Sequence, residues 1–501
     1  MKPRDPDVRR LLVILLVVSA GLRIYLASAG GQFFFPDERR YETSREIVAL
    51  LLAGNLGDAT ETAAQFPHLG FRVVGIVPAL IERVVGESAV VPAAFFGLFS
   101  VANIWLLFAI ARRAGASDPE ALLAAFLLSL SSTSFYYARH LLPYDVGLTL
   151  ALAAILAAVR TPARLRDAAL CGLLAGCSFL VYLGYWTVAA FAVLLPAFQP
   201  SLGFAKSARR LAVSSLAFVA PFVVMFGVDA SLGGNLIGKF IRFSGDPGLA
   251  IQGLFSEGWR LPFAYLWHAE HGLFVAWLLA LGAAVPLAAS RRLARSASLG
   301  VFGVLFVYAA LVVLSVGLEK YVVLGRLVRQ CVPFFCLLTA HWLERLRTLP
   351  GTRATLAFRA LIALACIQAA ANFHTPLTQV FPDEFGKLAV RAGAAHQASH
   401  PSGQYRVLRA KSLYPAPRKV TLPPHVTLLA APHPTEFLPY QYEEYTPDQR
   451  AVLRATDIRM RLVYIQDGPI QDGPIQDGPI EDLPDPGIEG ARAGPAEREP
   501  S

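Results

Sequence analysis

The chain has 501 residues, of which 55% are hydrophobic and 16% are charged, and its formal net charge is +9. Soluble globular proteins carry about 25% charged residues, so this composition excludes an ordinary soluble domain. The positive charge does not indicate a nucleic-acid-binding protein, because the sequence has no basic strip interleaved with aromatic residues.

Long apolar runs occupy most of the chain up to about residue 373. A run of about 18 or more apolar residues can cross about 30 Å of hydrocarbon as a helix. The runs do not alternate with polar residues, so helices are favoured over a β-barrel. We predict an all-α polytopic membrane protein with eleven spans, near residues 11–29, 89–111, 120–138, 144–160, 168–184, 185–199, 211–229, 271–290, 298–316, 328–344 and 355–373.

Basic residues in the short loops predict the orientation of these spans. The N-terminus resembles a signal peptide, and we interpret it as an uncleaved signal anchor. With the N-terminus inside, five basic clusters lie on the cytoplasmic side, as the positive-inside rule requires: Arg112/Arg113, Arg160/Arg164/Arg166, Lys206/Arg209/Arg210, Arg291/Arg292/Arg295 and Arg345/Arg347/Arg353. The C-terminal segment is then outside, and the short inner loops are compatible with a bacterial inner membrane.

The first outer loop, residues 30–88, is predicted to contain two helices. Residues 41–52 form an amphipathic pattern typical of a helix that lies in the membrane interface. Residues 70–85 are apolar but, at 16 residues, short for a span. We interpret them as a second interfacial or re-entrant helix.

The tail is predicted to lie outside the membrane. Within a small extracytoplasmic region at 374–465, residues 405–409 and 459–465 are expected to form strands. The repeats of Gln-Asp-Gly-Pro-Ile between 465 and 480 are too polar to form a packed core, so 466–501 are predicted to be disordered. The predicted domains are therefore a membrane domain at 1–373, the outer region and this low-complexity tail.

Two adjacent acids, Asp37 and Glu38, lie just outside the first span. A carboxylate near lipid has a reason to have its pKa raised, which suits a general base. The alternative is that Asp37 caps the following helix and Glu38 supports its first turn.

Cations gather in two other outer segments. Arg139 and Asp145 flank the turn between the third and fourth spans, and Lys320, Arg326 and Arg329 precede the tenth span. Arginine binds phosphate through paired hydrogen bonds, and Lys320, Arg326 and Arg329 lie against the positive-inside trend, which favours an anionic ligand for this second segment. The alternatives are a snorkelling arginine in an aromatic belt and simple solvation of a loop.

His268, Glu270 and His271, at the outer end of the eighth span, are candidate ligands of a metal ion. Their spacing is not the HExxH pattern that places two histidines on one helical face. Interfacial histidines also serve as plain polar anchors. The five cysteines lie in apolar runs without a CxxC pattern, so they indicate neither a disulfide framework nor a zinc site.

The motifs together resemble the C-type (GT-C) membrane glycosyltransferases. The Pro-Asp-Glu-x-x-Tyr stretch that ends at Tyr41, followed by an amphipathic helix, is most similar to glycosyltransferase family 39, which includes protein O-mannosyltransferases and bacterial aminoarabinose transferases. The run from Tyr137 to Asp145 resembles that family's second outer loop. The run from Arg329 to Pro333 resembles its Arg-Tyr-Leu-Leu-Pro segment, with Gln330 in place of the usual tyrosine. The resemblance covers roughly residues 8–373.

The resemblance implies a GT-C-like catalytic bundle that transfers a sugar from a polyprenyl phosphate to an acceptor hydroxyl on the outer face, with inversion. By analogy Asp37 is the base and Glu38 orients it or contacts the acceptor. The remaining motif residues are implied to bind substrates, with the cations on the donor phosphate: Tyr41, Arg139, Asp145, Lys320, Arg326 and Arg329. Family members differ in their use of a divalent ion, so no cofactor follows. The acceptor, whether protein, lipid or glycan, is not identified.

Two other classes of function remain open. A transporter or flippase of lipid-linked sugars would place ionisable residues near the bilayer midplane, whereas here they gather at one outer edge. A non-catalytic receptor for lipid-linked sugars would need the same cations but not Asp37.

Overall fold

The computed structural model describes residues 5–28, 40–64, 69–160, 164–198, 203–231, 234–245, 255–289, 293–320, 323, 325–378, 405–413, 426–432 and 460–467. The chain divides into two compact units, and the described helices lie in the first unit, which includes residues 1–379. The described strands lie in the second unit. The predicted helical architecture of the membrane domain is confirmed.

Each predicted span coincides with a helix or with a bent pair of helices. These helices are α1 (Pro6–Ser28), α5 (Val90–Arg113), α6 (Asp118–Leu130) with α7 (Ser132–Tyr136), α8 (Tyr144–Ala158), α9 (Leu165–Val181), α10 (Trp186–Leu194), α11 (Phe204–Ser231), α14 (Gly272–Ala289), α15 (Arg295–Val312), α17 (Val332–Thr348) and α18 (Thr352–Thr378). By length and composition, 5 helices in the described ranges are able to cross a membrane, or 6 if α6 and α7 form one broken span. The chain is an integral membrane protein, and the count of eleven spans stays a prediction.

Local sequence fixes where several of these helices begin. The Ser117 hydroxyl accepts a hydrogen bond from the Glu120 amide at 3.1 Å, and a proline lies in the first turn of α6. The Asp167 carboxylate in the first turn of α9 accepts from the Arg164 amide at 3.0 Å. Such caps satisfy amides that have no partner within the helix.

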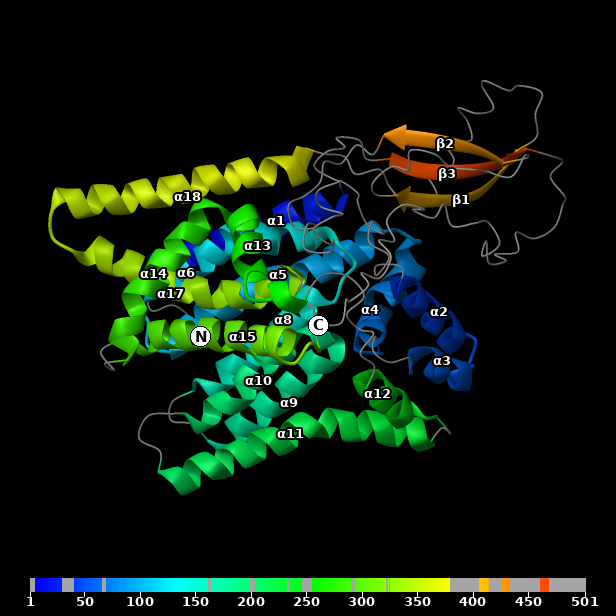
Figure 1. The fold of residues 1–501 in the computed structure, drawn as a ribbon, viewed down its shortest axis with the longest axis horizontal. Coiled ribbons are helices and arrows are strands. Elements are labelled where there is room, and N and C mark those ends of the chain that lie inside the picture. Colours follow the sequence, from blue (N-terminus) through cyan, green and yellow to red (C-terminus); the bar gives the residue numbers. More distant parts are fainter. Residues whose placement is uncertain are drawn as a thin grey trace, which may run out of the picture. The chain divides into compact units, whose positions relative to one another are not determined.

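The helices pack around α5 and α17 (Figure 1). Helix α5 contacts α1, α6 and α8, while α17 contacts α6, α14 and α15. Helix α11 packs on α9 at one edge of the unit, and α18 lies at the opposite edge (Figure 1). In each of these two helices only 6% of the most apolar 18-residue stretch is buried by the rest of the protein. Most of the surface of both helices is therefore left to face lipid.

The two ends of the bundle carry different contacts. At one end, Arg112 pairs with Asp118 at 2.5 Å and Arg113 donates to the Leu156 carbonyl at 2.8 Å. At the other end of the same helices, Asp145 pairs with Arg329. Arg295 donates to the Val159 carbonyl at 3.4 Å, so basic residues of three of the five predicted cytoplasmic clusters, Arg112/Arg113, Arg160 and Arg295, lie at the first of these ends. We call it the inner end and the other the outer end, after the predicted orientation.

Three helices form the described part of the first outer loop: α2 (Arg40–Leu52), α3 (Leu56–Ala63) and α4 (Leu69–Val85). The two predicted helices are thus confirmed. The buried Glu82 carboxylate joins α4 to α2, because it accepts hydrogen bonds from the Tyr41 hydroxyl at 2.8 Å and from Arg45 at 2.8 and 3.0 Å. Burial and this hydrogen bond raise the pKa of Tyr41, so the phenol stays protonated and donates.

Short helices complete the first unit: α12 (Leu236–Gly245), α13 (Leu261–Glu270) and α16 (Gly325–Val328). The second unit contains an antiparallel sheet of β1 (Tyr405–Leu413), β2 (Val426–Pro432) and β3 (Met460–Asp467), in the order β1-β3-β2. The two predicted strands correspond to β1 and β3, whereas β2 was not predicted. Strand β3 continues through Gln466 and Asp467, two residues into the segment predicted to be disordered.

Replacing Glu82 by glutamine is expected to loosen the outer loop. The variant removes the charge that pairs with Arg45 and disturbs the contact with Tyr41, which costs about 1–3 kcal/mol. The midpoint of thermal unfolding in detergent should fall. Glu87→Gln is the matched control, because Glu87 also pairs with Arg45, at 2.6 Å, but its side chain is 73% exposed. Equal shifts for the two variants would contradict this role of Glu82.

Candidate active site at the outer end

Three arginine side chains are buried together at the outer end of the bundle. Arg23 comes from α1, Arg139 from the 3₁₀ turn that follows α7, and Arg329 from the 3₁₀ turn that precedes α17. Their exposed fractions are 1%, 0% and 0%. Removing a guanidinium from water is costly unless the protein or a ligand compensates its charge. We call these three residues the arginine cluster.

Three consecutive aromatic residues place one ring beside each arginine. The guanidinium carbon of Arg23 lies 5.7 Å from the ring centroid of Phe135. Arg139 lies 5.7 Å from the Tyr136 ring, and Arg329 lies 5.4 Å from the Tyr137 ring. These distances are those of cation–π contacts. We call residues 135–137 the aromatic triplet. Together, α7 and the 3₁₀ turn after it, which we call the α7 segment, contact all three arginines through these rings.

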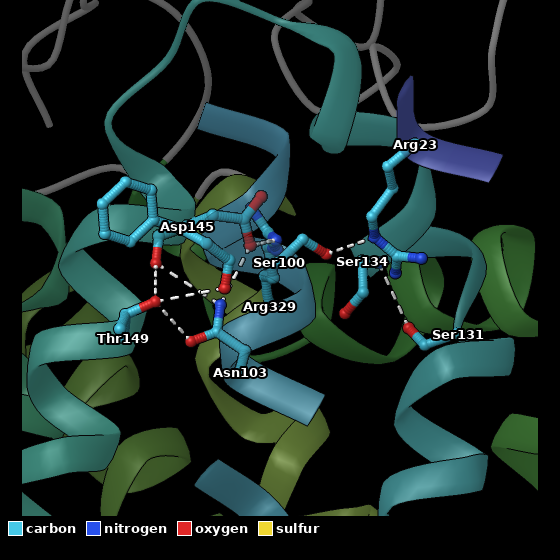
Figure 2. A network of polar contacts seen from close by, with 9 residues as sticks. Arg23, Ser100, Asn103, Ser131, Ser134, Asp145, Thr149 and Arg329 are labelled. Carbon is cyan, nitrogen blue, oxygen red and sulfur yellow. Dashed lines mark hydrogen bonds and ion pairs between the residues drawn. The ribbon is translucent and has the colours of Figure 1, made fainter. Parts of the chain in front are cut away.

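Asp145 compensates part of the charge. Its carboxylate pairs with Arg329 and accepts from the Asn103 amide at 3.1 Å (Figure 2). The Thr149 hydroxyl donates to the Asn103 side-chain oxygen at 2.8 Å, which fixes the orientation of that amide. Asp145 lies in the first turn of α8, where the helix dipole also favours a negative charge.

Arg23 is held by short polar contacts on α1 and α5. Its Nε donates to the Ser100 hydroxyl at 2.9 Å (Figure 2). Its Nη1 donates to the Ser19 carbonyl at 3.1 Å. A glycine lets α5 approach the segment that carries Arg139, because a Cβ at Gly97 would lie 2.7 Å from the Ala138 carbonyl oxygen.

Some guanidinium nitrogens in the cluster are left without a protein partner. Within the described residues, Nη2 of Arg23 and both Nε and Nη1 of Arg329 are buried and donate no hydrogen bond. Buried donors of this kind are normally satisfied. An anionic oxygen would satisfy them, so the arrangement is suited to binding an anionic group.

Further tyrosines continue from the triplet. Ring centroids are separated by 5.3 Å between Tyr137 and Tyr144, by 4.7 Å between Tyr144 and Tyr182, and by 5.0 Å between Tyr182 and Tyr185. Arg326, which is half-buried, donates to the Tyr144 hydroxyl at 3.4 Å. The fourth predicted cation of this end, Lys320, is exposed.

Gln330 joins the site to α10. Its side-chain oxygen accepts from the Thr187 hydroxyl at 2.6 Å and from the Val188 amide at 3.2 Å. Its side-chain nitrogen donates to the Gly184 and Leu327 carbonyls at 3.0 and 2.9 Å. All hydrogen-bonding groups of this amide are therefore paired, and Gln330 ties the turn that contains Arg329 to α10.

The structure brings four of the predicted substrate-binding residues to one region: Arg139, Asp145, Arg326 and Arg329. Tyr41 is fully buried and its hydroxyl is bonded to Glu82, so its predicted contact with substrate stays a prediction. Asp37 and Glu38 lie outside the described residues, immediately before α2.

The predicted metal site has a different arrangement. Glu270 is fully buried and accepts hydrogen bonds from Ser131, Ser132 and Thr133, while His271 is exposed. The side chain of His268 lies outside the described residues. Across the ranges that the structure describes, no group of three His, Cys, Asp or Glu side chains is arranged to hold a metal ion.

Sequence reasoning did not include Arg23 among the site residues. Its signal was present, because Arg23 is a charged residue inside an apolar run, and ionisable residues within spans are often functional. Ser100 and Asn103 carried no comparable signal, since single polar residues are common in membrane helices.

Replacing Asp145 by asparagine is expected to destabilise the protein. The variant leaves the buried Arg329 without its counter-charge, which typically costs about 3–5 kcal/mol. The midpoint of thermal unfolding should fall clearly. Asp229→Asn is the control, because the buried Asp229 carboxylate accepts from the Leu236 amide at 2.7 Å, a bond that asparagine can retain. A drop for Asp229→Asn as large as that for Asp145→Asn would contradict the assignment.

No family model and no curated protein matches the sequence. Solved structures with a similar fold include an oligosaccharyltransferase from Archaeoglobus fulgidus tethered with an acceptor peptide, with a TM-score of 0.43, 13% identity, and coverage of 78% of this chain and 58% of that chain. Another is ArnT from Cupriavidus metallidurans in the apo state, with a TM-score of 0.48, 16% identity, and coverage of 77% and 68%.

A third is the oligosaccharyltransferase AglB from Archaeoglobus fulgidus in complex with an inhibitory peptide and a dolichol-phosphate, with a TM-score of 0.43, 11% identity, and coverage of 74% and 56%. The chain thus spans less than two thirds of the length of the oligosaccharyltransferases.

Proposed function

We propose that the chain is a membrane glycosyltransferase that takes a sugar from a polyprenyl-phosphate donor and transfers it to an acceptor hydroxyl on the outer side of the membrane. The observation that carries the proposal is the arginine cluster, in which buried guanidinium nitrogens of Arg23 and Arg329 lack protein partners within the described residues. A phosphate joined to a lipid chain is an anion that reaches such a site from the bilayer.

The chemistry needs few groups. Asp37 accepts the proton of the acceptor hydroxyl, and that oxygen forms the new bond to the anomeric carbon with inversion. The bond from this carbon to the phosphate oxygen breaks, and polyprenyl phosphate leaves with the electron pair. Arg139 and Arg329 stabilise the charge that grows on the phosphate. Glu38 orients Asp37 or the acceptor, and Asp145 holds Arg329 in place.

The sequence motifs supply the second line of support. The acids of the Pro-Asp-Glu-x-x-Tyr stretch directly precede α2, and the described end of that stretch, Tyr41, packs against Phe96 of α5 with ring centroids 6.4 Å apart. Ser100, on the same helix α5, holds Arg23. Helix α5 therefore contacts both Tyr41, the described end of this stretch, and the side chain of Arg23.

Replacing Arg139 by glutamine is expected to weaken donor binding. The loss of a charge-assisted hydrogen bond costs about 1.5–3 kcal/mol, which corresponds to a roughly 10- to 150-fold rise in the KM for the donor. The assay is sugar transfer or release from polyprenyl-phosphate sugars by protein in nanodiscs. Arg113→Gln at the inner end is the matched control and should leave KM unchanged. Equal effects of both variants would contradict a specific phosphate contact.

Replacing Asp37 by asparagine is expected to abolish turnover but not donor binding. Loss of a general base lowers kcat by about 10²- to 10⁴-fold. Asp58→Asn is the control, because Asp58 is an exposed acid of the same outer loop that contacts only Asn55 among the described residues. If the wild type binds the lipid but transfers no sugar, a flippase or receptor is the better reading. If Asp37→Asn is as active as the wild type, another residue is the base.

A further inference from the structure

Glu270 is a buried carboxylate that the chemistry above does not use. It is the last residue of α13, has no exposed surface, and lies at the outer end of the bundle. Its Oε1 accepts from the Ser131 hydroxyl at 2.7 Å and from the Thr133 amide at 2.9 Å, and its Oε2 accepts from the Ser132 amide at 3.0 Å. Both oxygens are therefore directed at the beginning of α7.

These contacts lie at a break in a membrane helix. Helices α6 and α7 meet at an angle of 58°, and Ser131 between them is extended, with φ −64° and ψ 121°. The first amides of α7 have no carbonyl partner within the helix, and unsatisfied amides in an apolar bundle are costly. A carboxylate from another helix satisfies two of them, and the Ser131 hydroxyl accepts from the Ser134 amide at 3.3 Å.

A second helix braces the same point. Asn372 of α18 donates to the Ser132 hydroxyl at 2.7 Å, and Gln368 of α18 donates to the Glu270 carbonyl. The backbone that presents Glu270 is itself constrained, because His271 adopts φ 45° and ψ −117°, which is unusual for a residue with a Cβ. The position of α7 is thus fixed from two helices that are remote in sequence.

The segment that Glu270 caps contains the aromatic rings that contact the arginine cluster. The 3₁₀ turn that contains Arg139 follows α7 without a break. The aromatic triplet at 135–137 contacts all three arginines. A rotation of α7 would move these rings together with Arg139. A change at Glu270 is therefore transmitted to the phosphate-binding groups without any contact between Glu270 and the substrate.

We propose that Glu270 is a positioning residue, whose carboxylate fixes the α7 segment so that Arg139 and the aromatic triplet hold the arginine cluster in a phosphate-binding arrangement. This inference rests on the proposed function. In this proposal Glu270 is an anion that caps the first turn of α7, whereas the sequence suggested it as a metal ligand.

The test compares Glu270→Gln with a matched variant in nanodiscs, with undecaprenyl phosphate as the lipid probe. Glu270→Gln should raise the dissociation constant for this lipid and the donor KM by 10-fold or more, with a smaller effect on kcat. Glu120→Gln is the control, because Glu120 is also a buried carboxylate and accepts from Ser296 at 2.8 Å, but at the inner end of α6. It should leave both constants unchanged even if stability falls.

A double-variant cycle separates positioning from general stability. Because Arg139 lies on the segment that Glu270 fixes, adding Glu270→Gln to Arg139→Gln should worsen lipid binding by a smaller factor than Glu270→Gln does in the wild type. Independent, multiplicative effects would overturn the inference, as would wild-type lipid binding in Glu270→Gln. If Glu270→Gln does not fold, Asn372→Leu, which removes the brace from Ser132, should raise the same dissociation constant, and an unchanged value would overturn the inference.

Failure of the proposed function has a different signature. If the wild type binds undecaprenyl phosphate but transfers no sugar, the transferase proposal fails while the lipid-binding comparison of Glu270→Gln with Glu120→Gln still applies. If the wild type binds no undecaprenyl phosphate, the phosphate-binding site itself fails. Hydrogen exchange at the amides of Ser132 and Thr133 still tests the capping contact, since it should accelerate in Glu270→Gln and not in Glu120→Gln. Unchanged exchange would overturn the capping role whatever the ligand is.

Discussion

The burial of three guanidinium groups in an apolar helical bundle is the constraint on which the rest of this structure depends. Each guanidinium must keep its charge compensated where water does not reach it. The protein supplies one carboxylate to Arg329, a serine and a carbonyl to Arg23, and an aromatic ring to each member of the cluster. Nitrogens of Arg23 and Arg329 remain without partners among the described residues, which is the condition for binding an anion.

This constraint explains irregular features elsewhere in the bundle. The chain bends by 58° between α6 and the segment Ser132–Arg139, and this second segment carries the three rings of the triplet and Arg139. The break exposes amides, and Glu270 and Ser131 satisfy them. The close approach of α5 requires a residue without a side chain, and Gly97 occupies that position.

Hydrophobicity was sufficient to predict the long apolar helices, whereas the short helices α3, α12 and α13 were not predicted. The α5 run and the α11 run are long and apolar, and their membrane character depends only on local composition. Arg139, Arg329 and Asp145 were identified as candidates because charged residues at the ends of apolar runs are conspicuous, and their contact with substrate stays a prediction. Strand β2 was missed, since its short apolar run resembles many others in this chain.

The pairing of residues across the bundle was not predictable. Arg23 reaches Ser100, Gln330 reaches Thr187, and Glu270 reaches Ser131, and each contact joins helices that are far apart in sequence. A single sequence contains no signal for such contacts, because each residue alone also fits a simpler role. Glu270 shows the consequence: its neighbouring histidines suggested a metal, whereas its carboxylate caps a helix.

The most direct test of this account compares the binding of undecaprenyl phosphate with that of undecaprenol, which has the same chain but no phosphate. Both are titrated into the wild-type protein and into Arg329→Lys, a variant that keeps the charge but changes the donor geometry. The account predicts that the wild type binds the phosphate at least 10-fold more tightly than the alcohol, and that Arg329→Lys loses most of this preference. Equal affinity of the wild type for the two lipids would contradict the arginine cluster as a phosphate-binding site.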